Sequence, residues 1–175
     1  MKVIFNKVSV VLLSFAMLTG CSSSDSDAAA TTTPAETDAA QAVKTATAAV
    51  PGTAATPTKI DTADEHRWAV DITLSNGAVV TVEIARSSGE IEEIKGEKGP
   101  FDYEIAPPKP GLMTFSQAKQ KAFGAKMGAV EVWEVKPPTN LYEIYVRDTD
   151  EHLWEIKMTA DKGDVTSVLE KTAAD

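Results

Sequence analysis

A group of acidic and imidazole side chains near the end of the sequence could bind a divalent cation. Asp148, Asp150 and His152 alternate through a predicted hairpin turn, with Glu151 among them. If the alternation of the flanking strands continues through the turn, these three side chains point the same way and offer oxygen and nitrogen ligands. The alternative is a solvated turn in which the two aspartates accept hydrogen bonds from local amides, the usual role of aspartate in turns. We favour the turn and keep the metal site as the second interpretation.

Patterns typical of catalysis do not occur in the sequence. His66 and His152 are the only histidines, and neither lies in a His-Glu-x-x-His motif. A Gly-x-Ser-x-Gly nucleophile turn and a P-loop are also absent. The single cysteine, Cys21, has no partner for an intramolecular disulfide and is expected to carry lipid, which excludes it as a nucleophile. We therefore predict a protein that is not an enzyme and has no cofactor.

The N-terminal residues have the features of a lipoprotein signal peptide. Two lysines precede an apolar run, Val8 to Leu18, that is too short to span a bilayer. A Leu-Thr-Gly-Cys sequence ending at Cys21 resembles the bacterial lipobox, in which cleavage precedes the cysteine and a diacylglyceryl group is attached to its sulfur. Residues 1–20 are thus expected to be removed, and Cys21 to anchor the protein on the extracytoplasmic side of the membrane. The alternatives are an ordinary signal peptide with a chance cysteine, and a buried strand.

The next segment, residues 21–60, is predicted to be a disordered stalk. It consists mainly of Ser, Ala, Thr, Pro and Asp, with hardly a large apolar side chain. Such a segment buries too little apolar surface to offset its chain entropy. The whole chain has a formal net charge of −9, and no basic cluster could follow a phosphate backbone. Nucleic acid is therefore excluded as a partner.

The remaining residues contain the same core pattern twice. Residues 68–94 and 142–168 align without a gap at an offset of 74 residues, and it is the apolar positions and turn glycines that coincide. Two alternating strands, a turn and a short third strand in each copy predict an antiparallel meander. The only helix is predicted over residues 114–124, where Thr114 begins a capping box and alanines recur on one face. The first copy follows the predicted stalk, so we expect it to be truncated and to lack a helix.

A surface for partner recognition is predicted beside the strand Ala129 to Lys136. Val130 and Val132 would face the helix, which would place Trp133 on the opposite, open face of the sheet together with Tyr145. An exposed pair of aromatic side chains on that face would be a natural contact surface for another protein.

The second copy resembles the PepSY domain, a peptidase propeptide-like domain. The shared pattern is a helix with small residues on one face, a glycine, a strand, Tyr-x-Ile, a hairpin and a final Ala-x-x-Gly-x-Val. The resemblance is carried by Thr114, Ala118, Ala122, Gly128, Val130, Tyr142, Ile144, Ile156, Met158, Ala160, Gly163 and Val165. It covers residues 114–169, whereas residues 68–94 match only the strand part. One departure is Thr159, which stands where the family often has an aspartate.

This resemblance implies an α+β fold in which antiparallel meanders in two repeats, 61–106 and 107–175, pack with a single helix. It also implies a binding module without catalytic residues, because PepSY domains occur in propeptides of secreted metalloproteases and in small envelope proteins. We therefore expect a cell-envelope lipoprotein, attached to the membrane through Cys21, that binds and modulates or inhibits an extracytoplasmic peptidase. The alternative is an envelope protein that binds a divalent metal or a small ligand, with Asp148, Asp150 and His152 as the metal ligands.

Overall fold

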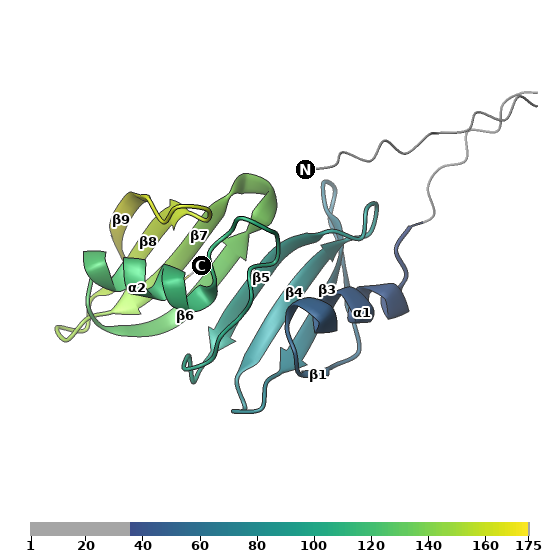
Figure 1. The fold of residues 1–175 in the computed structure, drawn as a ribbon, viewed down its shortest axis with the longest axis horizontal. Coiled ribbons are helices and arrows are strands. Elements are labelled where there is room, and N and C mark those ends of the chain that lie inside the picture. The colour runs from purple at the N-terminus through teal and green to yellow at the C-terminus, as the bar shows by residue number, and fades with distance from the viewer. Residues whose placement is uncertain (1–35, 175) are drawn as a thin grey trace, which may run out of the picture. The chain divides into compact units, whose positions relative to one another are not determined.

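The computed structural model describes residues 36–174, which form one folded unit (Figure 1). The predicted signal peptide, Cys21 and the first part of the predicted stalk lie outside the described residues. The helices are α1 (Ala39–Ala49), α2 (Phe115–Ala125) and the short 3-10 helix η1 (Pro137–Thr139). The strands are β1 (Thr53–Ala54), β2 (Thr58–Asp61), β3 (His66–Thr73), β4 (Val79–Ala85), β5 (Ile91–Lys98), β6 (Ala129–Lys136), β7 (Leu141–Arg147), β8 (Leu153–Thr159) and β9 (Val165–Lys171).

All nine strands belong to one antiparallel sheet, which confirms the predicted α+β class. Its order is β1-β3-β4-β5-β6-β7-β8-β9, and β2 also pairs with β3. From β3 onward, strands that follow one another in the sequence are neighbours in the sheet. Their connections are short turns, except between β5 and β6, where the connection contains α2. Within residues 36–174, no helix is long and apolar enough to cross a membrane.

The prediction of a disordered stalk is wrong for residues 36–60. This segment contains α1, whose N-cap residue Asp38 accepts a hydrogen bond from the backbone amide of Gln41 at 2.8 Å. Ala42, Ala46 and Val50 are fully buried against β3 and β4. Composition misled the prediction, because an alanine-rich stretch has little apolar surface of its own. Its small side chains nevertheless let a helix backbone approach a sheet closely, and packing on the sheet supplies most of a helix's stability.

The expectation of a single helix is consequently wrong, because the described residues contain two sheet-packed α-helices and one of them precedes the meander of the first repeat. Both α-helices have 11 residues. α2 begins after Thr114, which forms the predicted capping box, and it buries Ala118 and Ala122 at the same spacing as Ala42 and Ala46 of α1. In the first repeat, β1 and β2 together are the counterpart of β6. A break in the strand separates the two. We refer to residues 36–98 as the first repeat and to residues 113–171 as the second repeat.

The strand pairing repeats as closely as the element order does. At the offset of 74 residues, the pairing of Arg67 with Ala85 in the first repeat corresponds to that of Leu141 with Thr159 in the second. Each repeat also has a bulge in its third meander strand, at Glu92 of β5 and at the equivalent Thr166 of β9. Because bulges reposition every following side chain, their recurrence shows that the two halves share backbone geometry as well as topology.

In each repeat, one hydrogen bond from an aromatic side chain fixes the start of the helix, but the donor group differs between the repeats. In the first repeat the indole Nε1 of Trp68 donates to the carbonyl of Thr37 at 2.8 Å. In the second repeat the hydroxyl of Tyr142, which occupies the equivalent position, donates to the carbonyl of Met113 at 3.2 Å. Each acceptor directly precedes the N-cap residue of its helix. An aromatic side chain of the meander therefore ties the chain that enters the helix to the sheet.

The repeats join where β5 pairs with β6, a junction that we call the seam. It consists of three residue pairs: Ile94 with Val135, Lys95 with Glu134, and Gly96 with Trp133. A Cβ atom on Gly96 would lie 2.3 Å from the indole Nε1 of Trp133, so only glycine leaves room for this ring.

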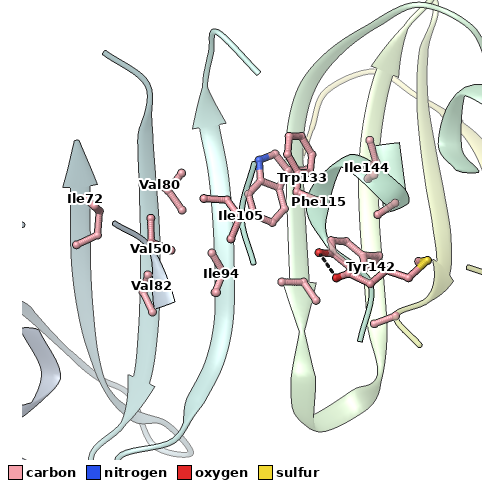
Figure 2. Packing of buried hydrophobic residues seen from close by; sticks show 14 of the residues in the cluster. Val50, Ile72, Val80, Val82, Ile94, Ile105, Phe115, Trp133, Tyr142 and Ile144 are labelled. Atoms are coloured by element: carbon pink, nitrogen blue, oxygen red, sulfur yellow. Dashed lines mark hydrogen bonds between the residues drawn. The ribbon is translucent and has the colours of Figure 1, made fainter. Parts of the chain in front are cut away.

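The core covers the face of the sheet on which both α-helices lie. A row of directly opposed and almost fully buried residues crosses six strands: Val70, Val82, Ile94, Val135, Tyr142 and Met158. Figure 2 shows this packing, with Val50 at the end of α1 near Val80 and Val82, and Phe115 of α2 beside Trp133. Buried side chains from both repeats therefore form a single cluster.

Candidate interaction surface

Trp133 does not lie on the open face of the sheet, so the prediction that it does is wrong. The side chain is fully buried beneath α2, where it stacks on Phe115 with ring centroids 4.4 Å apart. Its Nε1 donates to the hydroxyl of Tyr103 at 2.8 Å. The reason is a bulge in β6 between Val130 and Val132, which shifts the alternation by one residue and turns Trp133 toward the helix.

Tyr145 does lie on the opposite face of the sheet, but it is not available to a partner. Its side chain is 1% exposed, and its hydroxyl donates to the Glu155 carboxylate at 2.9 Å. The predicted exposed aromatic pair therefore does not exist in this structure. We call the face opposite α1 and α2 the far face.

The far face is an array of ion pairs. Four glutamates on adjacent strands are nearly buried there, although no helix covers them: Glu93, Glu134, Glu143 and Glu155. Lysines on the same face neutralise them, with Nζ–Oε distances of 2.7 Å from Lys136 to Glu134, 3.1 Å from Lys157 to Glu143 and 3.4 Å from Lys171 to Glu155. Three of the four carboxylates are thus paired with lysines of the same face.

Glu93 and Glu134 are the exception to simple neutralisation, because they place two carboxyl groups together beside the seam. Burial raises the pKa of Glu93 to about 7, and the charge of Glu134 and a hydrogen bond to it act in the same direction. The Lys136 ammonium group, 3.7 Å from Glu93, opposes this increase in pKa only in part. Near neutral pH, therefore, the protonated and the charged form of the Glu93 carboxyl are both populated.

In the turn between β7 and β8, Asp148 accepts hydrogen bonds from local amides, as the favoured interpretation expects of it. One carboxylate oxygen of Asp148 accepts hydrogen bonds from the amides of Asp150 and His152, at 2.9 and 3.0 Å. The other accepts from the indole Nε1 of Trp154 at 2.7 Å, and these bonds hold the pKa of Asp148 below its ordinary value. Both oxygens of Asp148 are therefore used locally. Among residues 36–174, no three His, Cys, Asp or Glu side chains gather as metal ligands.

The large apolar side chains that are exposed to solvent lie mainly on β9. Of the four in the described part of the chain, three belong to β9: Val165, Val168 and Leu169, which are 44, 36 and 52% exposed. The fourth, Met127, follows α2 and is 73% exposed. β9 is the outermost strand of the second repeat and pairs only with β8. Its outer backbone edge and its apolar side chains are thus presented together, which is the arrangement that accepts an additional strand.

The opposite edge of the sheet is blunted. It consists of the short strands β1 and β2, and Pro57 lies in the gap between them. Proline has no amide hydrogen to donate, and a short interrupted edge is a common device against unwanted pairing. β9, by contrast, has seven residues and contains no proline. Among the two edges, the β9 edge is therefore the candidate interaction surface.

Sequence reasoning missed this surface because it assigned Val165 and Val168 to the core by their equivalence to Ile91 and Ile94. That equivalence is correct for the fold. Ile94, however, is fully buried because β6 follows β5 in the sheet, whereas Val168 lies on a strand with no neighbour on its outer side. A repeat pattern identifies equivalent positions, and only the sheet order shows which of them are covered.

Comparison with known proteins confirms the resemblance in the second repeat. Residues 112–169 match the PepSY family, described as the peptidase propeptide and YPEB domain. The match spans α2 and the strands from β6 nearly to the end of β9. A crystal structure of a proposed lipoprotein from Clostridium difficile 630 aligns with 20% sequence identity and a TM-score of 0.34, over 66% of this chain and 80% of that chain. No curated protein matches the sequence significantly.

Proposed function

We propose that this chain, which carries a PepSY domain at residues 112–169, is a lipid-anchored envelope protein that binds and modulates an extracytoplasmic peptidase without catalysing a reaction itself. PepSY domains are in general linked to propeptide or inhibitor-like roles, which supports a peptidase as the class of partner. The lipobox-like sequence ending at Cys21 supports anchorage through a diacylglyceryl group.

The observation that carries the proposed binding mode is the exposed edge of β9. The far face was the other candidate surface, but three of its four nearly buried carboxylates are already paired with lysines of the same face. β9 instead combines an open backbone edge with three of the four exposed large apolar side chains among the described residues. An extended segment of the peptidase would add to the sheet beside β9 by antiparallel or parallel pairing. Backbone hydrogen bonds would then supply affinity without demanding a particular sequence.

Side chains on the two faces of β9 would supply selectivity. Val168 pairs with Ile156 of the core face, whereas Leu169 pairs with Glu155 of the far face. A docked strand would therefore contact side chains of β9 on both faces of the sheet, because successive residues of a strand point to opposite faces. Burying Leu169 from about half exposed would contribute on the order of 1 kcal/mol, which a single charged substitution would remove.

The experiment measures the rates of extracytoplasmic peptidases of the host cell in the presence of lipid-free protein. This protein starts at residue 21, carries Cys21→Ser and contains every described residue. We expect it to change the rate of at least one peptidase, and Leu169→Lys to abolish the change. Met127→Lys is the matched control, since it places the same charge on another exposed apolar residue that does not belong to β9. Unchanged rates for every peptidase, or equal effects of both variants, would argue against the proposal.

A further inference from the structure

We propose that the β9 edge is also self-complementary, so that two copies of the chain pair through β9 as a twofold dimer that covers the docking edge. The regulatory meaning of this dimer rests on the proposed function, whereas its existence does not. The seam, the blunted opposite edge and the sequence of β9 each support it.

The seam shows how a neighbouring strand can cover the outer edge of a strand equivalent to β9. β5 is the counterpart of β9 in the first repeat, and its outer edge is covered by an antiparallel strand of the same fold. Ile94, at the centre of that pairing, is fully buried. Its counterpart Val168 is 36% exposed, because no strand among the described residues pairs with the outer edge of β9. An antiparallel strand from a second copy would therefore give the second repeat the cover that the first repeat already has.

A head-to-tail arrangement, in which β9 of one copy repeats the seam with the first edge of another, is disfavoured. At the offset of 76 residues that relates β6 to the first edge, the counterpart of Trp133 is Pro57. Proline cannot donate a hydrogen bond to an incoming strand, and the break between β1 and β2 shortens the edge further. The edge that remains available in every copy is β9 itself, and pairing it with the same strand gives a closed twofold dimer.

The residues of β9 suit antiparallel pairing with themselves. If the twofold axis passes beside Val168, this residue faces Val168 of the other copy. Ser167 then lies opposite Leu169 on both sides of the axis, and the regular stretch ends at Ser167, because Thr166 is the extra residue of a bulge in β9. No two like charges are directly opposed, a juxtaposition that would be destabilising. Leu169 and Val168, the exposed apolar residues at the centre of the strand, become covered in both copies.

Such a dimer would have a single antiparallel sheet running through both copies, with α2 of each copy on the same face. It would also occupy the edge to which the peptidase is proposed to dock, so dimerisation and peptidase binding would compete. Confinement of anchored copies to the membrane raises their effective concentration relative to free copies, which favours the dimer. Dimerisation through β9 would thus prevent the protein from binding a peptidase until a peptidase segment displaces the second copy.

Sedimentation equilibrium of the lipid-free protein tests the dimer. We expect a concentration-dependent monomer–dimer equilibrium that Leu169→Lys shifts to monomer and that Met127→Lys leaves unchanged. Circular dichroism verifies that each variant is folded, as expected for substitutions at exposed positions. A monomer at every concentration, a dimer that survives Leu169→Lys, or growth into filaments of many copies would overturn the inference.

A cysteine at the axis tests the register independently. The lipid-free protein has no cysteine, so Val168→Cys would introduce a single thiol. Mild oxidation should yield a disulfide-linked dimer, whereas Met127→Cys in the same background should react much more slowly. Equal rates would overturn the proposed register. These measurements need no peptidase: a monomer that still changes peptidase rates would refute the dimer alone, and a dimer without any effect on peptidases would refute the proposed function alone.

Discussion

Replacing Glu93 by Gln should stabilise the protein at neutral and alkaline pH, and by less than about 1 kcal/mol at pH 5. Glu93 is 9% exposed and lies beside Glu134 at the seam. In the folded protein its pKa is raised from an ordinary 4.5 to about 7, chiefly because burial disfavours the charged form. Glutamine has nearly the same shape, cannot ionise, and can donate a hydrogen bond to Glu134 at every pH.

The direction of the effect follows from proton binding. Between pH 4.5 and about 7, the folded state holds a proton on Glu93 that the unfolded state releases. The stabilising contribution of this proton is therefore complete below the unfolded pKa and is lost as the pH rises through the folded pKa. At about 1.4 kcal/mol for each pH unit, the whole interval corresponds to about 3 kcal/mol. The variant avoids this loss, because its side chain is neutral in both states.

Urea denaturation at a series of pH values from 5 to 8 measures the difference between the two proteins. The advantage of Glu93→Gln in free energy of unfolding should grow with pH and level off above 7, at up to about 3 kcal/mol. Glu97→Gln is the control on the same strand, because its carboxylate is largely exposed, and should change stability by no more than about 0.5 kcal/mol. Parallel pH profiles for the wild type and Glu93→Gln, or a variant less stable at pH 8, would refute the reasoning.

Three further substitutions, the first two each with a comparison variant, test the fold through the free energy of unfolding. Ala46→Asp would bury a charge between α1 and the sheet and should prevent folding, as seen by circular dichroism, whereas Ala48→Asp on the exposed side of the same helix should be tolerated. Gly96→Ala should cost about 1–3 kcal/mol through the clash at the seam, while Gly124→Ala, which meets no atom within 4 Å, should stabilise α2 by about 0.5–1 kcal/mol. Tyr142→Phe should cost about 1–2 kcal/mol, because the carbonyl that precedes α2 loses its buried donor.

Local signals were sufficient to predict the meanders and α2. Alternation of apolar residues and glycine turns defined the strands, and the capping box at Thr114 placed the start of the helix at the correct residue. These features depend on neighbours in the sequence. The helix α1 was missed because its stability comes from the sheet on which Ala42 and Ala46 pack, and the composition of the segment gives no sign of that contact.

The candidate surface depended on features that a sequence does not reveal. A bulge after Val130 reverses the face on which Trp133 lies, and a bulge has no signature in the order of residue types. The exposure of Val168 depends on sheet order, since its counterpart Ile94 is covered by a strand from the other repeat. For Asp148, the expected hydrogen bonds from nearby amides are present, because they are a local effect that the sequence of a turn reveals.

Amide hydrogen exchange of the lipid-free protein, with and without a peptidase whose rate it changes, tests the central claim most directly. If a segment of the peptidase adds to the β9 edge, exchange should slow at residues 165–171 relative to the free protein, because their outward amides become hydrogen-bonded. Exchange in the interior strands β5 and β6, which have a strand on each side, should stay the same. Protection confined to β5 and β6, or complex formation without any slowing in β9, would contradict the proposed mode of binding.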